Sequence, residues 1–278
     1  MTIPLLLATA VLIAAALSLI MAGAWLVQQR TGNSGWVDTI WTFGLGACGI
    51  ALALAPISRL AAPAPRQVVV AILAALWSLR LGMHIALRTR RIIDDPRYAQ
   101  LIRQWGDDAA VQMFWLLQKQ AVVTLPLALT IMLAAQNSLP RLRLADALGA
   151  AILILSVAGE SLADLQLRHF RSNEANAGKV CDRGLWRWSR HPNYFFEWLG
   201  WLAYPLIAID PTGSYPYGLI AAIGPICMYW LLVHVSGIPP LEAHLLKSCG
   251  GYQAYQSRTN AFFPGWPGPR SKTPMSLP

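Results

Sequence analysis

Long apolar stretches alternate with short polar connections along the chain, and this pattern predicts an all-α membrane protein. About 20 mostly apolar helical residues cross the ~30 Å hydrocarbon core of a bilayer. The stretches that approach or exceed this length lie at 3–27, 36–58, 67–87, 120–136, 144–165, 194–211 and 216–236. The sequence therefore predicts a single polytopic domain with about seven transmembrane helices.

The distribution of basic residues predicts the orientation of these helices. The first stretch begins without a basic residue and has a long apolar run, so we interpret it as a retained helix rather than a signal peptide. The positive-inside rule then places the N-terminus outside and the C-terminus in the cytoplasm, which agrees with an odd number of spans. The basic residues on the cytoplasmic side are Arg88, Arg90, Arg91, Arg97, Arg103, Lys119, Arg168, Arg171, Lys179, Arg183, Arg187, Arg190, Lys247, Arg258, Arg270 and Lys272.

Composition excludes most soluble classes. The chain is 55% hydrophobic and only 13% charged, whereas soluble domains carry about 25% charged residues. The net charge of +9 comes from short connections between apolar stretches, which fits membrane topology better than nucleic-acid binding. The four cysteines form no CxxC pair, so we expect buried thiols and no metal site.

Two segments outside the apolar stretches are predicted to form other structures than transmembrane helices. Residues 92–118 predict an amphipathic helix at the cytoplasmic interface, anchored by Trp105, Phe114 and Trp115. The proline-rich last fifteen residues predict an extended tail.

A glycine motif needs a structural interpretation. Gly44, Gly46 and Gly49 spell GxGxxG, but they lie inside an apolar helical run without the strand that a dinucleotide fingerprint requires. Small residues in a membrane helix favour close helix packing, and we expect that role here.

The fifth apolar stretch carries a polar stripe. Glu160, Asp164, Arg168 and Arg171 are spaced by 4, 4 and 3 residues, which places them on one helical face. Ionisable groups in a membrane helix are costly and usually face the bundle interior or a wet cavity. The stripe can be a self-satisfying ion-pair ladder, or a wall about 16 Å long whose arginines bind the phosphates of a dinucleotide.

The segment from Gly184 to Trp198, GLWRWSRHPNYFFEW, holds the densest polar chemistry. Pro192 suits the first turn of a helix, and the basic pair before it can form an anion site at that helix start. Asn193 and Glu197 lie one turn apart and run into an apolar helix. An interfacial aromatic belt would explain the tryptophans but not these two residues, which suit a carboxamide or an adenine edge.

GLWRWSRHPNYFFEWLGW resembles the C-terminal signature of the membrane steroid 5α-reductases and the related Δ14- and Δ7-sterol reductases. Asp164-Leu-Gln-Leu-Arg-His-Phe-Arg171 is similar to the preceding helix of that family, and Tyr252-Gln-Ala-Tyr-Gln-Ser-Arg-Thr-Asn260 to its last segment. The resemblance covers roughly 155–265 and is strongest to the bacterial branch. The first 150 residues match only in hydropathy and helix count.

The resemblance implies NADPH bound by the C-terminal helices and hydride transfer to a lipophilic enone such as a 3-oxo-4-ene steroid. It implies a substrate side at 1–143 and a cofactor side at 144–265. Asp164, Arg168 and Arg171 would hold the adenosine phosphate end, and Asn193 and Glu197 the nicotinamide or diphosphate region. The other implied cofactor residues are Arg80, Arg91, Glu160, Trp186, Arg190, His191, Tyr194, Tyr252, Tyr255, Arg258 and Asn260.

Reduction of an enone also requires a hydrogen-bond donor for the developing enolate oxygen. The family uses a carboxyl group on the second helix and a tyrosine on the third. Here Asp38 is the nearest carboxyl group, and the third helix has no tyrosine; Trp77 and His84 are the catalytic candidates there. Asp38 can equally be a helix cap or an interfacial charge.

Two other functions compete with the reductase. Membrane methyltransferases of the isoprenylcysteine carboxyl type also carry an RHPxY element and a tail with Glu and Tyr, comparable to Glu242, Tyr252 and Tyr255, and they use S-adenosylmethionine. S-adenosylmethionine has no phosphate groups, however, so it would not explain two neighbouring arginines, Arg168 and Arg171. A non-enzymatic lipid-binding protein would leave the polar cluster unexplained.

The expected partners are a lipophilic steroid-like substrate and membrane lipids, without nucleic acid. We expect a monomer in a bacterial inner membrane. Arg168 with Arg171 favours NADPH over NADH because NADPH carries an additional phosphate.

Overall fold

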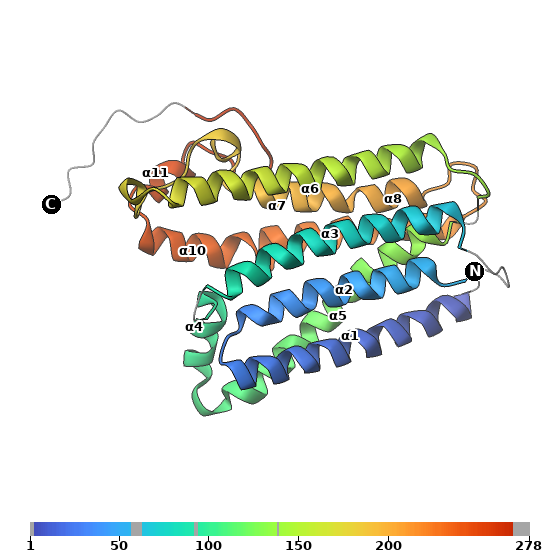
Figure 1. Ribbon diagram of the computed structural model, residues 1–278, viewed down its shortest axis with the longest axis horizontal. Coiled ribbons are helices and arrows are strands. Elements are labelled where there is room, and N and C mark those ends of the chain that lie inside the picture. Colours follow the sequence, from blue (N-terminus) through green and yellow to red (C-terminus); the bar gives the residue numbers. More distant parts are fainter. Residues whose placement is uncertain (1–2, 57–62, 92–93, 138, 269–278) are drawn as a thin grey trace. The chain divides into compact units, whose positions relative to one another are not determined.

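The computed structural model describes residues 3–56, 63–91, 94–137 and 139–268 (Figure 1). These residues form helices and connections, without a β-strand. The long helices are α1 (Ile3–Thr31), α2 (Gly35–Leu54), α3 (Pro65–Thr89), α5 (Ala109–Ala135) and α6 (Leu144–Arg171). The shorter elements are α4 (Pro96–Trp105), η1 (Gly106–Asp108), η2 (Glu174–Asn176), η3 (Gly184–Arg187), α7 (Pro192–Trp201), α8 (Ala203–Ala208), η4 (Pro216–Ala222), α9 (Ile223–Trp230), η5 (Leu231–Val235), α10 (Ile238–Ser248) and α11 (Tyr252–Gln256).

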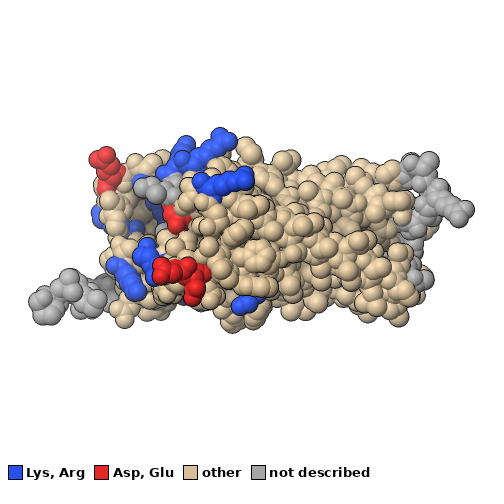
Figure 2. Space-filling view, turned by 90° about the horizontal axis from the view of Figure 1, so that it is seen from below, with Lys and Arg blue, Asp and Glu red and all other residues tan. Residues whose placement is uncertain are grey.

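The protein is an all-α polytopic membrane protein, as the sequence predicts. Six helical runs in the described residues are long and apolar enough to cross a bilayer, and they begin at Ile3, Gly35, Pro65, Arg97, Leu144 and Pro216. Most of the surface seen in Figure 2 consists of residues other than Lys, Arg, Asp and Glu. A surface poor in charge suits contact with lipid chains. The orientation of the helices stays a prediction.

Three predicted segments differ in detail from the observed helices. The stretch 194–211 is divided between α7 and α8, with Leu202 between them, so neither helix alone has the length of a span. The fourth apolar run contains α4 from Arg97 onward, η1 and α5, and α4 ends before Gly106, where φ is 55°. The stretch 92–118 is therefore not one helix: it contains α4, η1 and the first turns of α5. Residues 92–93 and the tail from 269 onward, with Arg270 and Lys272, lie outside the described residues.

The chain divides into two compact units, each of which is described by itself. Unit 1 comprises Met1–Ile154 and Trp201–Met228, and unit 2 comprises Leu155–Gly200 and Tyr229–Pro278. The boundaries fall within α6, before the last residue of α7, and within α9.

Helix α2 is the centre of unit 1 and packs against α1, α3 and α5. The glycine motif makes these contacts possible. A Cβ at Gly44 would lie 2.6 Å from the side chain of Ile20, and one at Gly49 would lie 2.8 Å from that of Ile131. At Gly46 the conflict would be with Ser78. The prediction that these glycines allow close helix packing is confirmed.

A buried ion pair fixes the ends of two helices in unit 1. Arg66 at the start of α3 is 2% exposed, and its Nε and Nη2 donate to the two carboxylate oxygens of Asp146 on α6, both at 2.9 Å. Its remaining donors bind the carbonyl oxygens of Asn137, Leu139 and Arg141. Such complete pairing is the condition under which a buried charge is tolerated.

Unit 2 contains the C-terminal part of α6, α7, α10 and α11. Helices α6 and α7 lie side by side in Figure 1, and small residues bring them together. A Cβ at Gly200 of α7 would lie 3.4 Å from Ser156 of α6. An aromatic cluster covers α7 on another side, where Phe195 and Trp198 contact Tyr229, Phe262 and Phe263 at ring-centroid distances of 5.5–6.2 Å.

Candidate functional site

Buried acidic side chains lie at two successive positions along the surfaces where α6 and α7 face each other. Asn193 Nδ2 lies 3.5 Å from Asp164 Oδ1, and a Cβ at Gly159 would meet the ring of Phe196. This antiparallel register puts Glu197 at the level of Glu160. The three acids Glu160, Asp164 and Glu197 are only 5%, 8% and 7% exposed. Unit 2 therefore brings together four residues that the sequence assigned to the cofactor.

Two polar side-chain atoms at this surface have no hydrogen-bond partner within the described chain. Asn193 Oδ1 is buried and makes no hydrogen bond among the described residues, and the same holds for Ser156 Oγ on α6. A buried polar atom without a partner costs about 1–3 kcal/mol, so an external donor here would be stabilising. An amide or hydroxyl group of a bound molecule has the required chemistry, which fits the carboxamide or ribose part of a nicotinamide nucleotide.

A second cluster in unit 2 is centred on Glu242 of α10. The Glu242 cluster consists of Arg190, His191, Glu242, Tyr252 and Gln256. Arg190 Nε and His191 Nε2 lie 2.7 Å and 2.9 Å from Glu242 Oε1. Tyr252 OH donates to the same oxygen at 3.1 Å, and Gln256 Nε2 donates to Oε2 at 2.7 Å. Side chains separated by about 50 residues thus share one carboxylate, whose acceptor positions are filled.

Backbone contacts join the RHPN segment to the C-terminal segment. Arg190 N donates to the carbonyl oxygen of Asn260 at 2.8 Å, and Gly265 N donates to that of Trp188 at 2.9 Å. The hydroxyl of Tyr255 donates to the carbonyl oxygens of Trp186 and Ser189. Tyr194 stacks on His191, with ring centroids 5.4 Å apart. We interpret the Glu242 cluster as a clamp that fixes the start of α7.

Burial changes the titration of three groups in this clamp. Burial lowers the pKa of His191 below its ordinary value, although the hydrogen bond and charge of Glu242 act in the opposite direction. Burial also raises the pKa of Tyr252 and of Tyr255, and the neighbouring Glu242 contributes at Tyr252. The two tyrosines therefore stay protonated and can act as donors.

The two arginines predicted to bind phosphate are exposed, unlike the buried acids of the same helix. Arg168 and Arg171 are both exposed at the end of α6, and no ion pair to either is found within the described ranges. The ladder in which Asp164 pairs with Arg168 is thus absent from the described residues. Arg258 instead pairs with Asp182 at 2.6 Å. Exposed guanidinium groups remain available to a phosphate.

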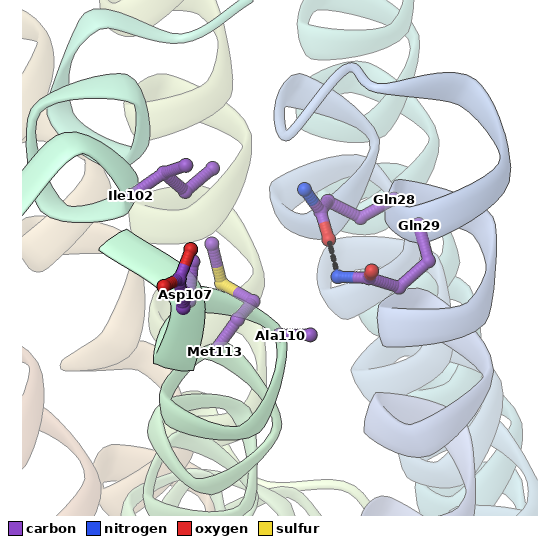
Figure 3. A pocket seen from close by; sticks show the side chains of 7 residues that line it. Gln28, Gln29, Ile102, Asp107, Ala110 and Met113 are labelled. Atoms are coloured by element: carbon purple, nitrogen blue, oxygen red, sulfur yellow. Dashed lines mark hydrogen bonds between the residues drawn. The ribbon is translucent and has the colours of Figure 1, made fainter. Parts of the chain in front are cut away.

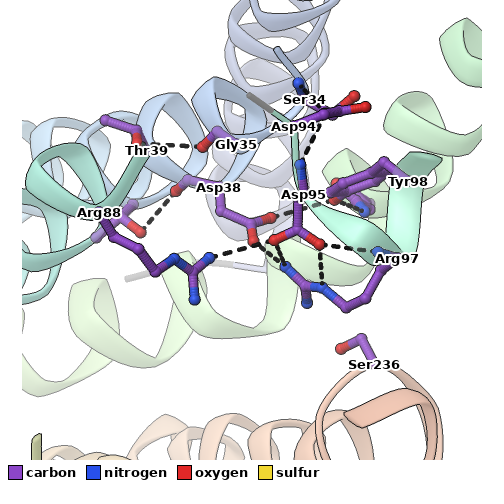
Figure 4. A network of polar contacts seen from close by, with 12 residues as sticks. Ser34, Gly35, Asp38, Thr39, Arg88, Asp94, Asp95, Arg97, Tyr98 and Ser236 are labelled. Carbon is purple, nitrogen blue, oxygen red and sulfur yellow. Dashed lines mark hydrogen bonds and ion pairs between the residues drawn. The ribbon is translucent and has the colours of Figure 1, made fainter. Parts of the chain in front are cut away.

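Unit 1 holds the catalytic candidates from the second and third helices. Asp38 on α2 belongs to the Arg97 network, which we define as Asp38, Arg88, Asp95, Arg97, Tyr98 and Gln120 (Figure 4). Trp77 on α3 is 4% exposed and packs edge-on against Trp41 and Trp201. His84 and Arg80 are half-buried on α3, and Arg91 is exposed just after it.

Arg97 is the link between two carboxylates in this network. It forms an ion pair with Asp38, and its Nε lies 3.0 Å from Asp95 Oδ1. Asp95 also caps α4 by accepting from the backbone N of Arg97 at 3.0 Å. Burial alone would raise the pKa of Asp95, but hydrogen bonds and the charge of Arg97, with the charge of Arg88, hold it below its ordinary value. Asp95 therefore lies as a carboxylate between two guanidinium groups.

Tyr98 supplies a tyrosine that sequence reasoning did not place in the site. Its hydroxyl donates to Asp38 Oδ1 at 3.1 Å and accepts from Gln120 Nε2 at 3.0 Å. Although α3 lacks a tyrosine, α4 brings one to the same carboxylate. The sequence signal was Asp95-Pro96, an N-cap followed by proline at the first helical position, which marks the start of α4.

A separate pocket of unit 1 has a volume of about 300 Å³. It is lined by Gln28 and Gln29 of α1, by Ile102 and Asp107, and by the first residues of α5, Ala109, Ala110 and Met113 (Figure 3). Its polar groups are two carboxamides and one carboxylate, so it has no basic group for a phosphate. In the chain as described, no group of three or more His, Cys, Asp or Glu is arranged to hold a metal ion.

Comparison with protein-family models matches residues 24–259 to a family described as "Protein of unknown function (DUF1295)". The match covers most of the chain, including the Arg97 network, the acids of α6 and α7, and the Glu242 cluster. Neither the comparison with curated proteins nor that with solved structures gives a match.

Proposed function

The chain belongs to the DUF1295 family, and from this membership and the chemistry of its two units we propose that it is an NADPH-dependent reductase of a lipophilic enone, of the steroid 5α-reductase kind. The proposed reaction saturates the C4–C5 double bond of a 3-oxo-4-ene steroid or a similar lipid. NADPH supplies the hydride. The resemblance of residues 155–265 to the 5α-reductases supports this assignment.

The observation that carries the proposal is the set of buried polar groups on α6 and α7. Acids in membrane helices usually face the bundle interior or a wet cavity, and these three are only 5–8% exposed. The partnerless Asn193 Oδ1 adds a specific need for an external donor. We propose that Asn193 and Glu197 orient the nicotinamide, while Glu160 and Asp164 accept hydrogen bonds from ribose hydroxyls.

Arg168 and Arg171 are proposed to bind the phosphates. Both are exposed and carry no ion pair in the described part of the chain, so they can meet an anion without first breaking an internal contact. A guanidinium group binds phosphate through two parallel hydrogen bonds. The Glu242 cluster is assigned a supporting task, because it fixes the start of the helix that carries Asn193 and Glu197.

In unit 1 the proposed task is stabilisation of the substrate's carbonyl oxygen. Negative charge develops on that oxygen as the hydride arrives at the β-carbon, and prearranged donors lower the barrier. We assign this task to the Arg97 network. Asp38 acts there as an acceptor, because Arg97 and Tyr98 donate to its two oxygens.

The methyltransferase alternative depends on the Glu242 cluster. A carboxylate that is to bind the methyl donor must have a free acceptor position, but Glu242 already receives hydrogen bonds from four side chains. The cluster therefore favours a structural clamp over a methyl-donor site.

The experiment that tests the proposal is turnover of a panel of 3-oxo-4-ene steroids by the detergent-purified protein with NADPH, followed by the mass of the product. We expect a product heavier by two hydrogens. Arg171→Ala should raise the KM for NADPH about tenfold, as loss of about 1.4 kcal/mol of binding requires. The exposed Arg187 gives a matched control, since Arg187→Ala should leave KM unchanged. Methyl transfer from S-adenosylmethionine without any reduction would overturn the proposal.

A further inference from the structure

Two arginines of the Arg97 network carry N–H donors that no other member uses. In the described part of the chain Arg88 is held by a single contact, at 3.2 Å to Asp95, and its side chain is 47% exposed, so its orientation is not fixed. Asp38, Tyr98 and Arg97 are each held by several hydrogen bonds, and these bonds distinguish them. Both oxygens of Asp38 are engaged as acceptors, Oδ2 from Arg97 and Oδ1 from Tyr98. The single hydroxyl proton of Tyr98 is directed at Asp38, because Gln120 donates to the oxygen of Tyr98 from another side. Neither group therefore offers a free proton to a substrate.

Arg97 differs because only part of its guanidinium group is engaged. Its Nε binds Asp95, and its Nη2 binds both Asp38 and Asp95. Among the described residues Nη1 makes no hydrogen bond, and the side chain is 33% exposed. Guanidinium is planar and carries five N–H donors in fixed directions, so two N–H groups of Nη1 remain available.

The orientation of this free edge is fixed by the local structure. Asp95 holds the residue twice, by capping the backbone N of Arg97 and by pairing with its side chain, both at 3.0 Å. Pro96 precedes it at the first position of α4 and restricts the backbone. A donor that is already aligned stabilises developing charge without reorganisation.

The charge around Arg97 suits a polar oxygen better than a full anion. Three carboxylates, those of Asp38, Asp94 and Asp95, stand here against the two guanidinium groups of Arg88 and Arg97, and Asp94 accepts from Asp95 N at 2.8 Å. A free phosphate would add negative charge to this excess of carboxylates, whereas a ketone oxygen adds none before reaction. The ligand expected at the free edge is therefore an uncharged carbonyl oxygen.

We propose that Nη1 of Arg97 is the hydrogen-bond donor that binds the carbonyl oxygen of the lipophilic substrate and stabilises the enolate formed on it. The part of this inference that concerns the enolate rests on the proposed function, because an enolate forms only when an enone is reduced. Binding of the carbonyl oxygen can be measured without turnover and without NADPH.

The test compares two steroids that differ only in the 3-oxo group. Their dissociation constants are measured by quenching of tryptophan fluorescence in the wild-type protein, in Arg97→Lys and in Arg103→Lys. Arg103 is an exposed residue of the same helix and serves as the matched control. The wild type should bind the 3-oxo steroid about tenfold more tightly than its 3-deoxy analogue, as one good hydrogen bond allows.

Arg97→Lys should bring this ratio close to one, and Arg103→Lys should leave it unchanged. Asp95→Asn is the second variant, because it keeps the guanidinium group but loosens its orientation; it should reduce the ratio even if Arg97→Lys does not fold. A ratio of one in the wild type, or an unchanged ratio in folded Arg97→Lys or in folded Asp95→Asn, would overturn the inference.

The outcomes for the two proposals are separable. If the wild type discriminates the ketone through Arg97 but never reduces it with NADPH, the carbonyl site stands and the reductase proposal fails. If the wild type reduces the enone while Arg97→Lys keeps both its kcat and its ketone preference, the reductase stands and the assignment of Arg97 fails.

Discussion

The Glu242 cluster of unit 2 and the Arg97 network of unit 1 are both built from arginine, carboxylate and tyrosine side chains. In the first the hydrogen bonds around the central carboxylate are complete, and in the second a firmly held donor stays open. Glu242 is 12% exposed at its side chain and receives protein donors at both oxygens. Arg97 is 33% exposed and keeps Nη1 unbonded within the described chain. A network closed around its charge stabilises the fold, whereas one with an open donor is suited to bind a ligand. Their difference yields four predictions about stability.

The largest effect is expected where the closed network loses its centre. Glu242→Ala leaves Arg190 as a largely buried charge without its carboxylate and takes an acceptor from His191, Tyr252 and Gln256. Breaking a buried ion pair from one side costs about 3–5 kcal/mol, so thermal unfolding in detergent should begin at a much lower temperature. Glu174→Ala, at an exposed residue of η2, should unfold like the wild type. Equal unfolding of both variants would show that Glu242 is not a clamp.

A smaller loss is expected for Tyr255→Phe. The variant removes the hydroxyl that serves the carbonyl oxygens of Trp186 and Ser189, and an unsatisfied buried polar group costs about 1–3 kcal/mol. Tyr217→Phe is the matched control, since no hydrogen bond of Tyr217 is found in the described residues. An unfolding temperature of Tyr255→Phe equal to that of the control would contradict the clamp.

The pH dependence of stability should report His191. Burial keeps its folded pKa below the ordinary value of 6.5, so the unfolded chain binds a proton first as the pH falls. The unfolding free energy should therefore be constant above pH 6.5 and decrease below it, by at most about 1.4 kcal/mol per pH unit. His191→Asn should lack this decrease in a comparison of unfolding curves. A decrease of the same size in the variant would assign it to other groups.

The smallest effect on stability is expected in the open network. Arg97→Lys keeps a positive charge beside Asp38 and the buried Asp95, so neither carboxylate is left without a neighbouring cation. Its unfolding temperature should lie close to that of the wild type, while the ketone preference is lost. A destabilisation as large as that of Glu242→Ala would make Arg97 a structural residue and remove the contrast.

Hydropathy predicted the helices well because spans and glycine packing are local properties of the sequence. The division of 194–211 at Leu202 has no comparable signal, since apolar residues continue across it. The fourth stretch was predicted to begin at residue 120, whereas α5 begins at Ala109, because Gln118 and Lys119 interrupt the apolar pattern. Gln118 is paired within the bundle, with Ser18.

The candidate site could be predicted only where its members lie on one helix. The spacing of Glu160 and Asp164, and of Asn193 and Glu197, placed each pair on a common face. Partners that are distant in sequence could not be found in this way. Glu242 meets Arg190 across 52 positions, and Tyr98 meets Asp38 across 60. Both contacts depend on how the helices pack.

The central claim is that the acids and the amide of α6 and α7 bind a nicotinamide nucleotide, and calorimetric titration of the detergent-purified protein with NADPH and with S-adenosylmethionine tests it most directly. The account predicts that NADPH binds, that Glu197→Gln weakens this binding about tenfold, equivalent to about 1.4 kcal/mol, and that Glu174→Gln does not. Binding of S-adenosylmethionine in place of NADPH, or equal NADPH affinity in both variants, would contradict it.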